Sequence, residues 1–203
     1  MKTIVNLAFL FLAMLVLATS SVAQSRGVPP ADYSQYGRPP VPVRVLLLIP
    51  EEFQRFVYVS TYEGDEIRHL LGQEGARELR AAFGIEFASV RVWPVTSEAE
   101  AMAMLAPKDP VNPELPAYDY VVIPKFTRVD SSVENQKYGF DIDLLTEFYA
   151  KDGAIVTKIT GRAGSSTGKW SASTPQEGAK IAVQSAVSAI IDGVEENRSL
   201  FVH

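Results

Sequence analysis

The sequence contains one motif typical of a catalytic serine. Residues 164–168 read Gly-Ser-Ser-Thr-Gly, which matches the G-x-S-x-G elbow of serine hydrolases, and Asp192 and His203 follow in the order of their triads. The elbow requires a strand, a sharp turn and an immediate helix, whereas the next helix is predicted only after Thr174. We therefore interpret the motif as a glycine-rich loop, and a secreted hydrolase that uses Ser166 is the alternative.

Carboxylates and histidines could instead form a metal site. Asp141 and Asp143 share one side of a predicted strand and could bind a hard cation. A cationic partner for Asp143, derived below, favours a solvated sheet face. Glu66 and His69 lie one turn apart on a predicted helix, as in half of a di-metal site, but the chain has no second Glu-x-x-His and His69 is expected at the surface or its boundary. We expect no catalytic, cofactor-binding or metal-binding residues.

The composition is that of an ordinary globular domain. The chain has 203 residues, of which 47% are hydrophobic and 21% charged, and its formal net charge is −5. This balance favours a folded domain over disorder and offers no basic surface for nucleic acid. Because the chain has no cysteine, disulfides, thiolate nucleophiles, iron–sulfur clusters and zinc–thiolate sites are excluded. Its two histidines leave little material for a multi-histidine metal site.

Residues 1–23 have the pattern of a secretory signal. Lys2 gives a positive start, residues 4–18 form a nearly unbroken apolar run, and small residues follow. The run is shorter than the roughly 20 residues of a membrane-spanning helix, which favours cleavage after Ala23 over an uncleaved anchor. The mature chain would begin at Gln24, and loss of Lys2 would change its charge from −5 to −6. We expect a periplasmic or secreted protein without a lipid anchor, because no cysteine follows.

Residues 24–42 are predicted to form a Pro-rich linker. Ser25 to Pro42 contains five prolines, two glycines and two tyrosines without periodicity. Such a composition is typical of an extended tether. Tyr33 and Tyr36 could alternatively form a docking segment for a partner.

The next part of the chain alternates strands and helices. Apolar runs and β-branched residues predict strands, while apolar residues at helical spacing, with Gly84 as a stop, predict a long helix. The predicted elements are strands 43–49 and 55–62, a helix over 65–83, a strand over 85–95, a short helix after the Ser97–Glu100 capping box, a loop over 108–117, and a strand over 118–129 in which Pro124 indicates an edge or bulge.

A hairpin is predicted between Tyr138 and Arg162. Apolar and polar residues alternate over 138–149, as in a strand with one buried face, and Asp152-Gly153 is a preferred two-residue turn. Paired residues then have numbers that sum to 305, that is, 152 plus 153. This register places two pairs of opposite charge across from each other: Glu147 with Lys158, and Asp143 with Arg162.

The C-terminal part is predicted to close the domain with a helix. Lys169 to Ser173 could return as a strand, and Thr174-Pro175-Gln176-Glu177 is a strong helix start. The buried stripe of the helix would consist of Ala179, Ala182, Val183, Ala186, Val187, Ile190 and Val194. Residues 199–203 are expected to be a tail.

Together these patterns predict a single α+β domain over residues 43–198. Its sheet should be mixed and largely antiparallel, with the two long helices 65–83 and 175–195 packed on one face. The aromatic residues Trp93, Trp170, Tyr58 and Phe148 are most simply core or rim residues, unless an exposed sheet face presents some of them to a partner. The candidate partner-surface residues are Tyr33, Tyr36, Tyr149 and Trp170.

The arrangement resembles small periplasmic and outer-membrane accessory domains, such as those of the curli-secretion lipoprotein family and the N-terminal domain of the Tol translocation protein. The resemblance rests on Tyr118–Pro124, Phe140–Tyr149, Asp152-Gly153 and Ala179–Val194. It implies a non-catalytic role in assembly, scaffolding or transport. Members of such families are often lipidated, whereas this chain has no anchoring cysteine.

We therefore expect a non-enzymatic, exported cell-envelope protein without cofactors that binds an envelope protein, or a second copy of itself, through a sheet edge or an exposed sheet face. Besides the hydrolase, the remaining alternative is a carrier that holds an apolar ligand between the sheet and its helices. No nucleic-acid partner and no membrane segment after signal cleavage are expected.

Overall fold

The computed structural model describes residues 31–36, 38–105, 117–134, 137–164 and 174–202. The elements in chain order are η1 (Tyr33–Tyr36), β1 (Val41–Pro50), α2 (Glu51–Gln54), β2 (Tyr58–Tyr62), β3 (Asp65–His69), α3 (Leu71–Glu86), β4 (Phe87–Val95), α4 (Glu98–Leu105), β5 (Tyr120–Glu134), β6 (Lys137–Ala150), β7 (Ile155–Ala163), α5 (Pro175–Glu196) and η3 (Arg198–Leu200). No helix within these ranges is long and apolar enough to cross a membrane.

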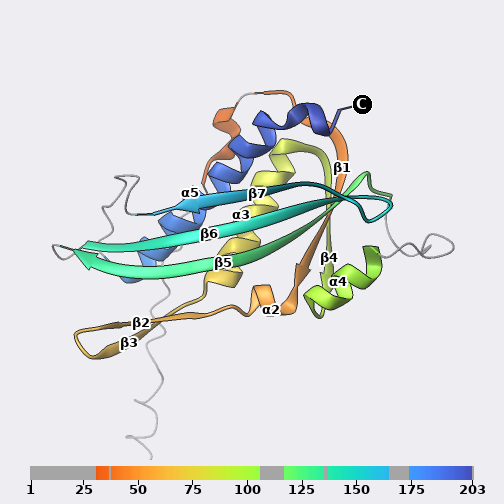
Figure 1. The fold of residues 1–203 in the computed structure, drawn as a ribbon. Coiled ribbons are helices and arrows are strands. Elements are labelled where there is room, and N and C mark those ends of the chain that lie inside the picture. The colour runs from red at the N-terminus through yellow and green to blue at the C-terminus, as the bar shows by residue number, and fades with distance from the viewer. Residues whose placement is uncertain (1–30, 37, 106–116, 135–136, 165–173, 203) are drawn as a thin grey trace, which may run out of the picture.

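The five-stranded sheet has the order β4-β1-β5-β6-β7, and β2 and β3 form a separate two-stranded sheet. The pairings of β1 with β4 and β5 are parallel, while those of β6 with β5 and β7 are antiparallel and include the longest ladder. The prediction of an α+β fold with a mixed, largely antiparallel sheet is thus confirmed. Helices α3 and α5 lie together on one face, and the short α4 lies at the other, a layer that the sequence did not predict (Figure 1).

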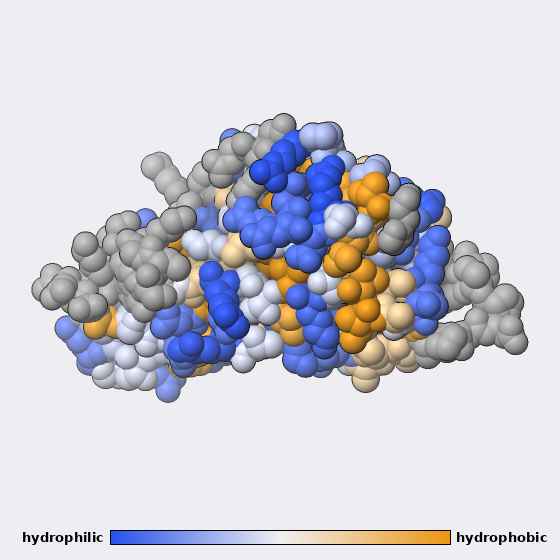
Figure 2. Space-filling model, turned by 45° about the horizontal axis from the view of Figure 1, so that its top comes forward, coloured by the Kyte–Doolittle hydropathy of each residue, from blue (hydrophilic) through white to orange (hydrophobic). Residues whose placement is uncertain are grey.

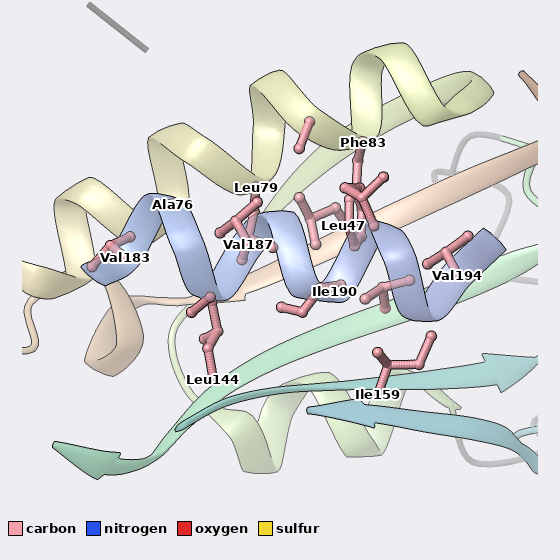
Figure 3. Packing of buried hydrophobic residues seen from close by; sticks show 14 of the residues in the cluster. Leu47, Ala76, Leu79, Phe83, Leu144, Ile159, Val183, Val187, Ile190 and Val194 are labelled. Carbon is pink, nitrogen blue, oxygen red and sulfur yellow. The ribbon is translucent and has the colours of Figure 1, made fainter. Parts of the chain in front are cut away.

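The core has one cluster on each face of the sheet. The main cluster lies between the sheet and the two long helices, where Leu47, Leu79, Phe83 and Leu144 are fully buried and interdigitate (Figure 3). The predicted stripe of α5 is buried throughout. A smaller cluster under α4 contains alternate residues of the same strands, such as Leu46, Leu48 and Val121. Strand β1 is therefore buried on both faces, as its continuous apolar run predicts.

The predicted hairpin register is confirmed from Phe148↔Thr157 to Ile142↔Ala163. The turn itself differs from the prediction. It has three residues, because the amide of Ala150 donates to the carbonyl of Ala154, and Gly153 has a φ of 80°. A left-handed glycine of this kind is typical of three-residue hairpin loops, and a bulge after Phe148 restores the expected pairing.

Both predicted capping motifs start helices. The hydroxyl of Thr174 accepts a hydrogen bond from the amide of Glu177, and Pro175 is the first residue of α5. At α4, Ser97 Oγ accepts from the amide of Glu100 at 3.1 Å, but the Glu100 carboxylate binds Thr96 instead of closing the capping box.

Proline at position 124 marks the point where β5 becomes an edge strand. Pairing of β5 with β1 ends at Val122, and a bulge follows between Phe126 and Arg128. The prediction of an edge or bulge at Pro124 is therefore confirmed, because β5 has become an edge strand at this position. The amide hydrogen that proline lacks is not needed there, since β1 no longer pairs with β5.

The helix predicted over 65–83 was placed too early. Residues Asp65–His69 form strand β3, which pairs with β2 across a turn at Glu63-Gly64, where both residues have positive φ. Positive φ at both central residues is the requirement of the tight two-residue hairpin turn. Helix α3 continues past Gly84 to Glu86, so Gly84 is not its stop.

Two segments predicted to lie outside the domain are packed against it. Tyr33, in the predicted linker, is 2% exposed, and β1 begins two residues earlier than expected. In the predicted tail, Phe201 is also 2% exposed and contacts the rings of Phe87, Tyr120 and Phe148. The predicted loop 108–117, apart from its last residue, and the predicted strand 169–173 lie outside the described residues.

Candidate functional site

Two of the four predicted partner-surface residues are buried. Tyr33 and Tyr149 are each 2% exposed, so neither can present a ring to a partner in this structure. The side chain of Tyr36 and the whole of Trp170 lie outside the part of the chain that the structure describes. The same holds for Ser166 and His203 of the hydrolase alternative, while Asp192 lies exposed on α5.

Tyr33 attaches the N-terminal segment to the helices. Its hydroxyl donates to Oε2 of Glu78 at 3.0 Å, and Glu78, in the middle of α3, is completely buried. Arg77 and Gln184 donate to the other carboxylate oxygen at 2.7 and 3.3 Å. A buried carboxylate is tolerated when it is hydrogen-bonded and paired in this way, so Tyr33 has a structural role.

Tyr149 belongs to the smaller core cluster under α4. Its hydroxyl donates to Oε2 of Glu147 at 2.8 Å. Burial and this bond to a carboxylate raise the pKa of Tyr149 above its ordinary value. The Tyr149 hydroxyl therefore stays protonated and acts as a neutral hydrogen-bond donor to Glu147.

The face of β5, β6 and β7 beyond α4 carries paired charges. Asp143 lies 3.7 Å from Arg162, and Glu147 forms an ion pair with Lys158, as the register predicted. Asp141 and Asp143 are half-buried, and no group of three or more metal-ligating side chains occurs within the described ranges. The arrangement supports the interpretation of a solvated face, because ion pairs occupy the carboxylates of Asp143 and Glu147.

His69 is buried, contrary to the expectation of a surface or boundary residue. It ends β3 at 2% exposure and packs edge-on against Phe140, with ring centroids 4.7 Å apart. Its Nε2 and Ser60 Oγ are 2.9 Å apart, while Nδ1 has no hydrogen-bond partner among the described residues. Burial lowers the pKa of His69, so the ring is neutral at pH 7. Glu66 and His69 both lie on strand β3, and not on a helix as predicted.

A cavity of about 290 Å³ lies beside this Ser60–His69 pair, between the β2–β3 hairpin and the far ends of β5 and β6. Its wall is rich in hydroxyl groups and includes one carboxylate: Ser60, Thr61, Tyr62, Glu63, Ser131, Ser132 and Tyr138, with Val133, Gly139, Phe140 and Pro175. The described lining offers hydrogen bonds to a neutral ligand and no cationic side chain for an anion. The Ser60–His69 pair resembles two members of a catalytic triad, but no carboxylate among the described side chains orients Nδ1.

Strand β4 forms an open edge of the main sheet. It pairs in parallel with β1, and no other described strand pairs with it (Figure 1). Among its nine residues, Phe87–Val95, only Arg91 is charged. Val92 is 36% exposed and lies opposite Leu47, on the face of the long helices. Unpaired backbone groups along such an apolar strand are a template for an additional strand.

The opposite edge, β7, is protected by charge. Lys158 and Arg162 project from it and are more than half exposed. Charged side chains of this kind are a common way of preventing edge-to-edge association.

On the face shown in Figure 2, hydrophilic residues predominate and apolar ones gather in a narrow band, so the exposed apolar surface is unevenly distributed.

Sequence reasoning missed the Ser60–His69 pair and the open edge at β4. The first could have been found from the Glu63-Gly64 turn, whose register sums to 127 and places residues 60 and 69 on one face of a hairpin. The second depends on the order of the strands. That order is fixed by contacts between distant segments and leaves no local signal.

No protein-family model matches the chain, and no curated protein sequence matches it. Among solved structures, the chain is similar to the hypothetical protein CT253 from Chlamydia trachomatis, with 11% identity and a TM-score of 0.41, over 76% of this chain and 96% of that chain. It is also similar to the lipoprotein GNA1162 from Neisseria meningitidis, with 12% identity and a TM-score of 0.36, over 76% of this chain and 99% of that chain.

Proposed function

We propose that this protein is an exported, non-enzymatic accessory protein of the cell envelope, and that it binds a protein partner by adding a strand of that partner to β4. Export is supported by the signal-like pattern of residues 1–23. Strand addition is supported by the open edge of β4, which is the observation that carries the proposal. An extended partner segment would pair its backbone with β4 and place alternate side chains on the two faces of the sheet.

The composition of β4 fits this role. A partner strand gains main-chain hydrogen bonds along the edge, and alternate residues of β4 add apolar contacts from Val90 and Val92 on one face and Trp93 on the other. Ile85, two residues before the start of β4, is 44% exposed. The only proline of strand β4 is Pro94, which lies one residue from the end of the strand and so leaves most of its edge available for pairing.

The proposal is tested by photo-crosslinking in the native host. A photoreactive side chain at Val92 should form an adduct with one discrete envelope protein, and the same group at Ile155, on the opposite edge and 52% exposed, should not. Mass spectrometry of the Val92 adduct should map the contact to one extended segment of the partner. Val92→Lys should then abolish capture through the neighbouring position Val90, because it places a charge inside the apolar contact.

The matched control is Ile155→Lys, which adds the same charge to an exposed strand position of the other edge. Both variants should keep the circular dichroism spectrum and melting temperature of the unsubstituted protein. Equal adducts from Val92 and Ile155, or capture that survives Val92→Lys, would overturn binding at β4. A loss of capture in both variants would argue for a binding surface elsewhere.

A further inference from the structure

The cavity between the β2–β3 hairpin and the end of β5 has a wall that is supported from behind by packed rings. Tyr58 and His69 pair with each other across the hairpin, which lies beside the end of β5 and the start of β6 (Figure 1). Both rings pack edge-on against Phe140 of β6, with ring centroids 6.1 and 4.7 Å apart. Phe140 is 4% exposed and lines the cavity. The hairpin is therefore anchored to the main sheet at the cavity.

The same two rings orient two serine hydroxyls of the cavity wall. Ser60 Oγ and His69 Nε2 share a hydrogen bond of 2.9 Å, and Ser131 Oγ shares one of 3.2 Å with the hydroxyl of Tyr58. Both serines are half-buried. A hydroxyl has one hydrogen to donate and two lone pairs that accept. Each serine thus uses one bond to fix its orientation and keeps capacity to bond a molecule in the cavity.

The wall of the cavity also contains aromatic surface. Tyr62 of β2 and Tyr138 of β6 both line it, and their rings meet edge-to-face with centroids 5.1 Å apart. Both residues are half-buried. A tyrosine combines an apolar ring with a polar hydroxyl, so the wall offers apolar contacts beside its hydrogen-bonding groups.

The charge of the cavity favours a neutral ligand. Glu63 is the one charged side chain in the described lining, and burial lowers the pKa of His69 behind it, so that ring is neutral at pH 7. A wall of hydroxyls is best matched by ligand groups that both donate and accept, which are again hydroxyls. The volume of about 290 Å³ is close to the lower end of the range for small-molecule sites, about 300–1,000 Å³.

We propose that this cavity binds a neutral saccharide. The hydroxyls of Ser60 and Ser131 form hydrogen bonds with sugar hydroxyls, while the rings of Tyr62 and Tyr138 pack against the C–H groups of the sugar ring. The same chemistry suits a free sugar and one unit of a longer glycan. The cavity shares no residue with β4, so the proposal does not depend on the partner strand proposed above.

Titration of the nitrogen-15-labelled protein, followed by two-dimensional NMR, tests the proposal. The probes are glucose, N-acetylglucosamine and their dimers cellobiose and di-N-acetylchitobiose. At least one should bind saturably with a dissociation constant of about 1 mM or below, and should shift the amides of residues 60–63, 131–133 and 138–140. Tighter binding of a dimer than of its monomer would identify a unit of a longer glycan, and equal affinities would identify a free sugar.

Two serine variants test the contacts themselves. Ser60→Ala and Ser131→Ala should each weaken binding about two- to tenfold, as expected for one lost hydrogen bond. The matched control is Ser188→Ala, because Ser188 is a half-buried serine of α5 that does not line the cavity, and it should bind like the wild type. Ser60→Ala also removes the described hydrogen-bond partner of the buried His69. Ser131→Ala therefore decides the test if Ser60→Ala does not fold.

Three results would overturn the saccharide site. The first is that none of the four sugars saturates the protein at about 10 mM. The second is that the shifted amides lie elsewhere in the chain, or that Ser131→Ala binds as tightly as Ser188→Ala. The third is that glucose 6-phosphate binds more tightly than glucose, because the described lining has a carboxylate and no cationic side chain to hold a phosphate.

Discussion

The hydroxyl of Tyr33 and the carboxylate of Glu78 join residues that are 45 positions apart in the chain, at 3.0 Å. This contact turns a segment with the composition of a linker into part of the domain, because it supplies one of the bonds that a fully buried carboxylate requires. The tyrosine ring is buried in the main cluster at the same time. The N-terminal segment is therefore anchored by a polar contact and an apolar one.

Replacement of Tyr33 by phenylalanine should test the polar part of this anchor. The ring remains, but Oε2 of Glu78 loses its hydroxyl donor, and hydrogen bonds to charged groups contribute about 1.5–3 kcal/mol. We expect the free energy of unfolding in urea to fall by about 2 kcal/mol. Tyr118→Phe is the control, since no described group bonds the Tyr118 hydroxyl, and it should change the value by less than about 0.5 kcal/mol. Equal effects of the two substitutions would contradict the anchor.

The buried ring of His69 should make the protein sensitive to acid. Burial lowers its pKa in the folded state, so the unfolded chain binds the proton more readily. The contribution of neutral His69 is fully present above its unfolded pKa of about 6.5 and is lost as the pH falls through the lower folded pKa. Melting temperatures measured between pH 7 and pH 5 should therefore drop less in His69→Gln than in the wild type.

The other histidine provides the control for this experiment. His203 is the only other such residue in the chain, so His203→Gln removes the same titratable group at a different place. It should leave the acid sensitivity unchanged. If His203→Gln abolishes the drop and His69→Gln does not, the assignment to the buried ring is wrong.

Two glycines of α3 should respond in opposite ways to alanine. A Cβ at Gly72 would overlap the backbone oxygen of Phe53, which cannot move without shifting α2, so Gly72→Ala should destabilise by about 3 kcal/mol or more. A Cβ at Gly84 meets nothing within 4 Å, and alanine there should stabilise the helix by up to about 1 kcal/mol. Chemical denaturation of both variants checks the pair. Equal signs would show that helix α3 does not pack as described.

Local patterns were sufficient where the deciding contacts are close in sequence. Alternation and charge pairing fixed the β6–β7 register, and the cap at Thr174 with the apolar stripe fixed α5. Strand β3 was mistaken for the start of a helix, because Ile67, Leu70 and Leu71 also suit helical spacing, whereas β2 lies within the strand predicted over 55–62. The positive φ angles of Glu63 and Gly64 instead form a tight hairpin turn, which pairs β3 with β2.

Burial of the chain ends could not be predicted, since it depends on distant partners. Tyr33 requires Glu78 of α3, and Phe201 requires rings from β4, β5 and β6. Neither segment has a periodicity of its own. The same reason explains why the open edge at β4 was missed, because it is formed by the order in which separate strands pack.

The start of β5 is held to β1 by a charge-assisted contact that should be sensitive only to strong acid. The carboxylate of Asp119 accepts hydrogen bonds from the backbone amide, Nε and Nη2 of Arg44 at 2.9, 3.1 and 2.8 Å. These bonds hold the pKa of Asp119 well below its usual range. The stabilisation is present above the unfolded pKa of about 3.9 and is lost as the pH falls through the lower folded pKa. Asp119→Asn should therefore cost about 1–2 kcal/mol at pH 7 in urea unfolding.

The comparison that decides is the same variant at lower pH. The difference between Asp119→Asn and wild type should persist at pH 5 and shrink only below about pH 4, where the unfolded wild-type chain begins to take up the proton. Asp130→Asn is the control, because Asp130 forms an exposed ion pair with Arg128, and such a pair contributes less than about 1 kcal/mol to the free energy of unfolding. A difference that already disappears between pH 7 and pH 5 would contradict a depressed pKa, and with it the three-bond contact between β1 and the start of β5.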